Sequence, residues 1–217
     1  MTDFAARRVM MVDTQVRPSD VTKFPIIDAM LNVPREVFVP DAQREAAYAD
    51  EILPLGEGRV MLDPRTLAKM LDVLNIGNDE LVLDVAGGLG YGAAVVARMA
   101  QAVIMVEEDE DMAGEAQGLL SDVGADNAVV HTGALPAGAA EHGPYDVILI
   151  EGGVENIPEN LEAQLKDGGR IGCIKMQGAL GEVLIGHKSG DLISWRLAFN
   201  AAAPVLPGFA AERAFAL

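Results

Sequence analysis

Cysteine is almost absent from this sequence of 217 residues, because Cys173 is the only one. A single thiol excludes an internal disulfide and a cysteine-rich metal site. Cys173 lies in the apolar run 171–174, which predicts a buried and unreactive side chain. The three histidines, His131, His142 and His187, are scattered along the chain, so we expect surface or structural roles and predict no metal site.

Basic residues are also scarce, since 16 Lys and Arg face 33 Asp and Glu and leave a formal net charge of −17. An acidic surface repels phosphate backbones and anionic lipids, so neither nucleic acid nor a membrane is an expected partner. Long apolar runs are missing as well, which predicts no signal peptide and no transmembrane helix. The cytoplasm is therefore the expected location, while the oligomeric state stays open.

Aromatic residues make up only 5% of a chain that is half hydrophobic, so the core must consist of aliphatic side chains. Such a composition suits a buried parallel sheet covered by helices. From residue 81 onward, apolar strands alternate with helical segments, a pattern typical of βαβ units. The predicted strands are 81–85, 103–106, 129–131, 147–150 and 170–174, and the predicted helices are 91–99, 112–120 and 158–165.

The two ends of the chain differ from this alternation. Segments 181–187 and 192–200 flank Ser-Gly-Asp and predict an antiparallel hairpin. Residues before 76 indicate helices and turns without strands, including a helix that Asp63 caps and Pro64 begins. We therefore expect an α/β fold with a Rossmann-like, mostly parallel sheet, an antiparallel C-terminal hairpin and helices on both faces. Residues 1–75 would form a helical extension packed on a ligand-binding domain of residues 76–217, as one structural unit.

The segment 84–91, Asp-Val-Ala-Gly-Gly-Leu-Gly-Tyr, directly follows the first predicted strand. Glycines at a strand-to-helix turn let a ligand touch the backbone, and the helix start offers free N–H groups. The alternative is a tight turn that merely needs positive φ angles. Gly87, Gly88 and Gly90 fall within four residues after a buried strand, which favours the ligand-binding interpretation.

Two nucleotide cofactors fit a loop of this kind. Gly88-x-Gly90-x-x-Ala93 matches the dinucleotide fingerprint of nicotinamide enzymes. Asp84, however, lies directly before the glycines, where its charge would repel a pyrophosphate. A carboxylate there suits a cationic ligand instead, such as S-adenosylmethionine with its ammonium and sulfonium groups.

Glu107 ends the next predicted strand, 107 − 84 = 23 residues after Asp84. An acidic residue at that position can accept hydrogen bonds from both ribose hydroxyls of a nucleotide. The competing interpretation is an acidic helix start, because residues 108–111 are all Glu or Asp and the helix dipole favours them there. The position after a βα unit favours the ribose role.

Several segments together resemble the protein-L-isoaspartate O-methyltransferase family. They are 33–40 (VPREVFVP), 47–48, 53–58 (LPLGEG), 82–91, 106–107, 144–146, 157–158 and 164–169. The resemblance implies S-adenosylmethionine as cofactor and methylation of isoaspartyl carboxylates in a protein or peptide substrate, the first step of repair. It also implies cofactor contacts from Asp84, Ala86, Gly88, Gly90, Tyr91 and Glu107, with Gly133, Ala134 and Leu135 beside the adenine.

The sequence departs from this family in the loop that follows Gly58. The family has Thr-x-Ser-x-Pro where this chain has Val60, Met61, Leu62, Asp63 and Pro64. Leu62 offers no hydroxyl for a substrate carboxylate, and Asp63 adds a negative charge. Leu62 and Asp63 are therefore the candidate positions at which substrate recognition differs.

Three further departures lie elsewhere in the chain. Ala86 replaces the first glycine of the loop, Ala134 replaces an acid near the adenine, and Glu151 begins a Glu-Gly-Gly segment in place of Thr-Ala-Ala. These changes keep two alternatives open: a divergent enzyme that methylates another substrate, and a cofactor-binding protein without activity. A nicotinamide dehydrogenase fits least, because no acid–base pair is evident.

Overall fold

The computed structural model describes residues 3–211, whose centre is a seven-stranded sheet in the order β5-β4-β3-β6-β7-β8-β9. Strands β3 to β7 pair in parallel, and β8 and β9 add to the edge in antiparallel orientation. The predicted Rossmann-like sheet with its C-terminal hairpin is confirmed. The strands are β3 Leu81–Val85, β4 Ala102–Glu107, β5 Ala128–Thr132, β6 Tyr145–Val154, β7 Leu165–Gln177, β8 Leu180–Ser189 and β9 Leu192–Asn200.

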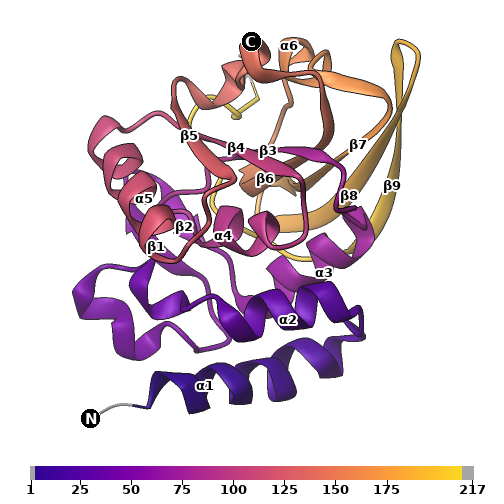
Figure 1. Ribbon diagram of the computed structural model, residues 1–217. Coiled ribbons are helices and arrows are strands. Elements are labelled where there is room, and N and C mark those ends of the chain that lie inside the picture. The colour runs from indigo at the N-terminus through magenta and orange to yellow at the C-terminus, as the bar shows by residue number, and fades with distance from the viewer. Residues whose placement is uncertain (1–2, 212–217) are drawn as a thin grey trace.

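Helices cover both faces of this sheet. Figure 1 shows the N-terminal helices α1 and α2 stacked beneath α3 and α4, on the opposite side of the sheet from α6. Helix α6 is shorter than predicted because Gln164 already turns the chain toward β7, with its side chain bonded to Ala137 and Ala139. The helices are α1 Phe4–Met11, α2 Phe24–Asn32, α3 Pro64–Leu74, α4 Tyr91–Ala97, α5 Glu110–Asp122 and α6 Glu159–Glu162. Within residues 3–211 none is long and apolar enough to cross a membrane.

The prediction that no strand precedes residue 76 is wrong. Strands β1 (Leu53–Gly56) and β2 (Arg59–Met61) form a small antiparallel hairpin. The turn between them places Glu57 at φ 47° and Gly58 at φ 74°. Proline and glycine in this segment indicate a loop, but here they shape a hairpin, since proline is tolerated on an edge strand.

Parallel register brings the ends of three strands to one level. Val85 of β3 is opposite Val106 of β4 and Ile150 of β6. The residues beside these positions therefore share the carboxyl edge of the sheet, where open α/β sheets bind their ligands. Away from this edge the interior is apolar, and Cys173 is fully buried there as predicted, which raises the pKa of its thiol to about 12.

Candidate active site

Three carboxyl groups meet at the carboxyl edge of the sheet: Asp84 on β3, Glu107 on β4 and Glu151 on β6. Asp84 and Glu107 are completely buried and Glu151 is 3% exposed. Buried carboxylates are costly unless they are paired, so each needs a partner. The three carboxyl groups differ in their partners, and these partners show which of them can bind a ligand.

Asp84 has no partner with hydrogen-bond geometry for either carboxylate oxygen among the described residues. Burial raises the pKa of its carboxyl to about 7, and the charge of Glu107 adds to this rise. Glu151, which can share a proton with Asp84, opposes it. Burial also raises the pKa of Glu151 well above its ordinary value, with the charge of Asp84 as the next cause.

This pair predicts an unusual pH dependence of stability. Because burial raises the pKa of Asp84 from 3.8 to about 7, the folded chain binds more protons than the unfolded chain between these values. Stability must then fall as pH rises through that window. We expect wild type to lose a few kcal/mol of unfolding free energy relative to Asp84→Asn between about pH 4 and pH 8. Urea denaturation at a series of pH values measures the difference, and parallel curves for the two proteins would contradict it.

The glycine loop between β3 and α4 has a backbone that only small residues adopt easily. Gly88 and Gly90 have φ angles of 58° and 97°. A Cβ atom on Gly88 would lie 2.6 Å from Leu55 Cδ1 of the β1–β2 hairpin. The left-handed loop therefore needs glycine at position 88, both for its φ angle and because Leu55 packs against the bare backbone there.

Glu107 is paired with Arg59 from β2, a partner that no pattern in the sequence indicates. Arg59 Nη2 lies 2.8 Å from Glu107 Oε1, Arg59 Nε lies 2.9 Å from Oε2, and both side chains are fully buried. Oε1 also accepts the backbone N–H groups of Glu108 and Asp109. Oε2 accepts only from Arg59 among the described residues, so it retains a lone pair for a ligand hydroxyl.

The segment after β5 lies directly beside Glu107. The backbone N–H of Gly133 donates to the carbonyl of Glu107 at 3.0 Å, and Leu135 is buried at the start of a 3₁₀ turn. Ala134 between them has no polar group to offer. These positions can provide an apolar wall next to the acid, but no side-chain hydrogen bond.

A buried arginine, Arg35, adjoins the other side of the glycine loop and is likewise absent from the sequence-based predictions. Its guanidinium lies 4.7 Å from the ring centre of Tyr91, and it donates to the carbonyls of Ala47 and Leu62. Its remaining nitrogen, Nη1, has no partner with hydrogen-bond geometry in residues 3–211. Arg35 stands inside one segment that carries the resemblance, and Arg59 directly follows another. The partners of both arginines are distant in sequence.

The two candidate substrate positions are both enclosed. Leu62 is fully buried, with its backbone carbonyl held by Arg35 at 2.7 Å. Asp63 accepts the backbone N–H of Thr66 at 2.9 Å and caps α3, as predicted from the Asp-Pro pair. Asp63 therefore uses its carboxylate to cap the start of α3, where the helix dipole favours a negative charge.

Comparison with known proteins adds the deciding observation. Residues 8–177 match the family model described as Protein-L-isoaspartate(D-aspartate) O-methyltransferase (PCMT). The chain belongs to this family. A protein-L-isoaspartate O-methyltransferase of Roseiflexus castenholzii is 34% identical over 192 residues, which cover 88% of this chain and 87% of the relative. One of Methylorubrum extorquens is 38% identical over 169 residues, or 78% of this chain and 74% of the relative.

Solved structures agree on the fold of the isoaspartate methyltransferase family. A protein-L-isoaspartate O-methyltransferase superposes with a TM-score of 0.81 at 24% identity, over 93% of this chain and 66% of that one. A putative Plasmodium falciparum family member, solved with S-adenosyl-L-homocysteine, gives 0.79 at 17% identity over 95% and 99% of the two chains. The predicted family and enzyme class, an S-adenosylmethionine-dependent O-methyltransferase, are thus confirmed.

Ala86, at the start of the glycine loop, is strained in this chain. Its φ angle of 65° is left-handed, a conformation that costs an L-residue roughly 1–2 kcal/mol. Ala86→Gly relieves this strain but gives the unfolded chain more freedom. We expect a net gain of about 1 kcal/mol in unfolding free energy, measured by urea denaturation. Gly114→Ala on the exposed face of α5, where a Cβ has open space, is a control that gains stability through helix propensity. An Ala86→Gly variant less stable than wild type would contradict the strain.

The histidines are less scattered in this family member than the sequence indicates. The rings of His131 and His142 lie 5.5 Å apart, centre to centre, in an edge-on arrangement. His187 lies elsewhere, on β8. His131 and His142 are thus neighbours in space although they are eleven residues apart, because the chain between them folds back on itself.

Proposed function

We propose that this protein methylates the carboxylate of isoaspartyl residues in damaged proteins, with the cofactor held at the carboxyl edge of β3 and β4. The family match over residues 8–177 carries the proposal, because it spans most of the chain. In this arrangement Asp84 accepts the methionyl ammonium group, and Glu107 accepts a ribose hydroxyl at Oε2. The cofactor lies against the loop residues Ala86, Gly88, Gly90 and Tyr91. Its adenine lies beside residues 133–135.

The fit between Asp84 and a cationic cofactor rests on the unsatisfied oxygens of its carboxylate. Within residues 3–211 neither buried oxygen accepts a hydrogen bond of good geometry, and a bound ammonium group would supply both a positive charge and donors. When bound, S-adenosylmethionine supplies a methyl group that its sulfonium already activates. A substrate carboxylate is ionised at neutral pH, so the chain needs no general base. Its residues have to position the two reactants in line and exclude water.

Arg35 is the residue that we propose compensates for the missing hydroxyl at Leu62. An anionic substrate requires a positive charge or donors where it docks. Arg35 is bonded to the carbonyl of Leu62, and among the described residues its Nη1 has no partner of hydrogen-bond geometry. Asp63 is occupied as the cap of α3. The position of the substrate carboxylate would therefore be set by a guanidinium next to the loop and not by the side chains within it.

We also propose that residues 1–75 and 76–217 act as one structural unit with no nucleic-acid or membrane partner. One apolar cluster includes Met11 and Ile26 from the N-terminal helices together with Val95 of α4 and Met105 of β4. The β1–β2 hairpin also belongs to residues 1–75, and its Leu55 packs against Gly88 of residues 76–217. The two parts therefore meet at the proposed site.

Methyl transfer from labelled S-adenosylmethionine tests the proposed reaction. We expect incorporation into an isoaspartyl peptide and none into the same peptide with normal aspartate. The product should be a methyl ester, so mild base should release the label as methanol. A base-stable product would instead indicate an amine substrate. Binding of S-adenosylhomocysteine without any transfer to the isoaspartyl peptide would overturn the proposal.

A further inference from the structure

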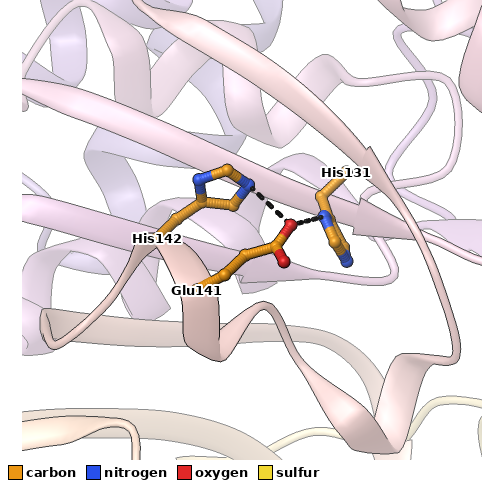
Figure 2. Close-up of side chains that lie close together, drawn as sticks. All are labelled: His131, Glu141 and His142. Carbon is orange, nitrogen blue, oxygen red and sulfur yellow. Dashed lines mark ion pairs between the residues drawn. The ribbon is translucent and has the colours of Figure 1, made fainter.

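A cluster of His131, Glu141 and His142 lies outside the proposed cofactor and substrate site, and nothing in methyl transfer requires it. His131 is on β5, and the other two belong to the 3₁₀ turn Ala140–His142. Figure 2 shows the two imidazoles turned toward the same carboxylate oxygen. His131 Nδ1 lies 3.5 Å and His142 Nε2 lies 3.4 Å from Glu141 Oε1.

These separations are those of ligand atoms around one metal ion. A tetrahedral Zn²⁺ with bonds of about 2.0–2.1 Å places neighbouring ligand atoms roughly 3.3–3.4 Å apart. One candidate ligand atom from each of the three side chains falls within 4.8 Å of the others. We propose that His131, Glu141 and His142 form a binding site for a divalent transition metal ion, with Zn²⁺ as the representative ligand.

The backbone that carries Glu141 and His142 is held firmly, so little reorganisation is needed to bind an ion. Gln164 accepts the N–H of Ala139 at 3.0 Å and donates to the carbonyl of Ala137 at 2.7 Å. The hydroxyl of Tyr145 donates to the carbonyl of Ala139 at 2.6 Å. The chain that leads into the turn is therefore anchored, which reduces the reorganisation that ion binding requires.

The donor set selects the class of metal. Two imidazoles and one carboxylate suit Zn²⁺, Ni²⁺, Co²⁺ and Cu²⁺, whereas Mg²⁺ and Ca²⁺ prefer oxygen ligands alone. The side chains of Glu141 and His142 are 68% and 40% exposed, so solvent can fill a fourth position. The net charge of −17 attracts cations to this surface.

Binding at this cluster would join β5 to the 3₁₀ turn Ala140–His142 and close the chain between them. That chain includes Gly133, whose N–H is bonded to the carbonyl of Glu107. The ion would therefore sit beside the segment that we propose flanks the adenine, without contributing to the methyl-transfer chemistry. Its role would be to stabilise this segment.

Calorimetric titration of the full, untagged chain with Zn²⁺ tests the site, with Mg²⁺ as a comparison. A buffer of about pH 8 limits the competition between protons and metal for the ligand atoms. We expect one Zn²⁺ per chain, no comparable Mg²⁺ binding, and a loss of affinity of at least about tenfold in His142→Ala. His187→Ala is the matched control because it removes a histidine outside the cluster, and its affinity should equal that of wild type.

Proton NMR provides a second measurement that needs no variant, because the chain has three histidines. Substoichiometric Co²⁺ should broaden the imidazole signals of His131 and His142 and leave that of His187 sharp. Equal broadening of all three signals, or Zn²⁺ affinity unchanged by His142→Ala, would overturn the site and indicate only diffuse binding to an acidic surface. Methyl transfer is not part of either measurement, so the two proposals can fail separately.

Discussion

Replacing Asp84 with asparagine is expected to weaken the binding of S-adenosylhomocysteine by about 1.5–3 kcal/mol, roughly 10- to 150-fold. The amide keeps the shape of the side chain but cannot pair with the methionyl ammonium group. In the absence of ligand the same change should stabilise the protein at about pH 8, because it removes a buried carboxylate that lies between Glu107 and Glu151. Calorimetry and urea denaturation measure the two effects.

Asp146→Asn is the matched control for Asp84→Asn, which should weaken ligand binding and at the same time stabilise the protein. Asp146 accepts the N–H of Leu81 and pairs with Lys166 at 2.7 Å, at the opposite end of the strands. Its replacement should lower the unfolding free energy and leave ligand binding unchanged. If Asp84→Asn bound S-adenosylhomocysteine within twofold of wild type, the methionyl group would have to lie elsewhere.

Replacing Glu107 with leucine is expected to lower the unfolding free energy by about 3–5 kcal/mol. The loss arises because Arg59 stays buried without the carboxylate that it contacts through two nitrogens. Glu108, 3.1 Å from Arg59 and 35% exposed, offers partial compensation and favours the lower end of this range. Urea denaturation at neutral pH gives the value directly.

A double-mutant cycle separates the ion pair from simple loss of packing. Arg59→Leu/Glu107→Leu removes both charges and should recover much of the stability that Glu107→Leu loses. If the losses of unfolding free energy in the two single variants add up in the double variant, Arg59 and Glu107 do not stabilise each other. Every variant without Glu107 should also bind S-adenosylhomocysteine less tightly than wild type, because the ribose loses its acceptor.

The parts of the fold that can be predicted are those whose signal is local. Strand β3 is predicted at its observed bounds because four of its five residues are apolar and a glycine loop follows them. Helix α3 is predicted from Asp63 and Pro64, since capping depends only on neighbouring residues. The β1–β2 hairpin escapes prediction because proline and glycine indicate turns by themselves and become strands only once β2 packs into the core.

The parts of the site that cannot be predicted depend on long-range pairing. Arg59 and Glu107 are 48 residues apart, and Arg35 is 27 residues from Leu62. No periodicity relates such positions, so the sequence shows the acids but not their partners. His131 and His142 are an intermediate case: both residues stand out in the sequence, but only the return of the chain to β5 places them around Glu141.

The most direct test of cofactor placement compares S-adenosylhomocysteine with 5′-methylthioadenosine, which has the same nucleoside but no amino-acid group. If Asp84 holds the methionyl ammonium and Glu107 the ribose, wild type should bind S-adenosylhomocysteine at least about tenfold more tightly. Asp84→Asn should remove most of that preference while binding methylthioadenosine like wild type. Equal affinities for both ligands in wild type, or a preference that survives Asp84→Asn, would contradict the placement of the cofactor at the carboxyl edge of β3.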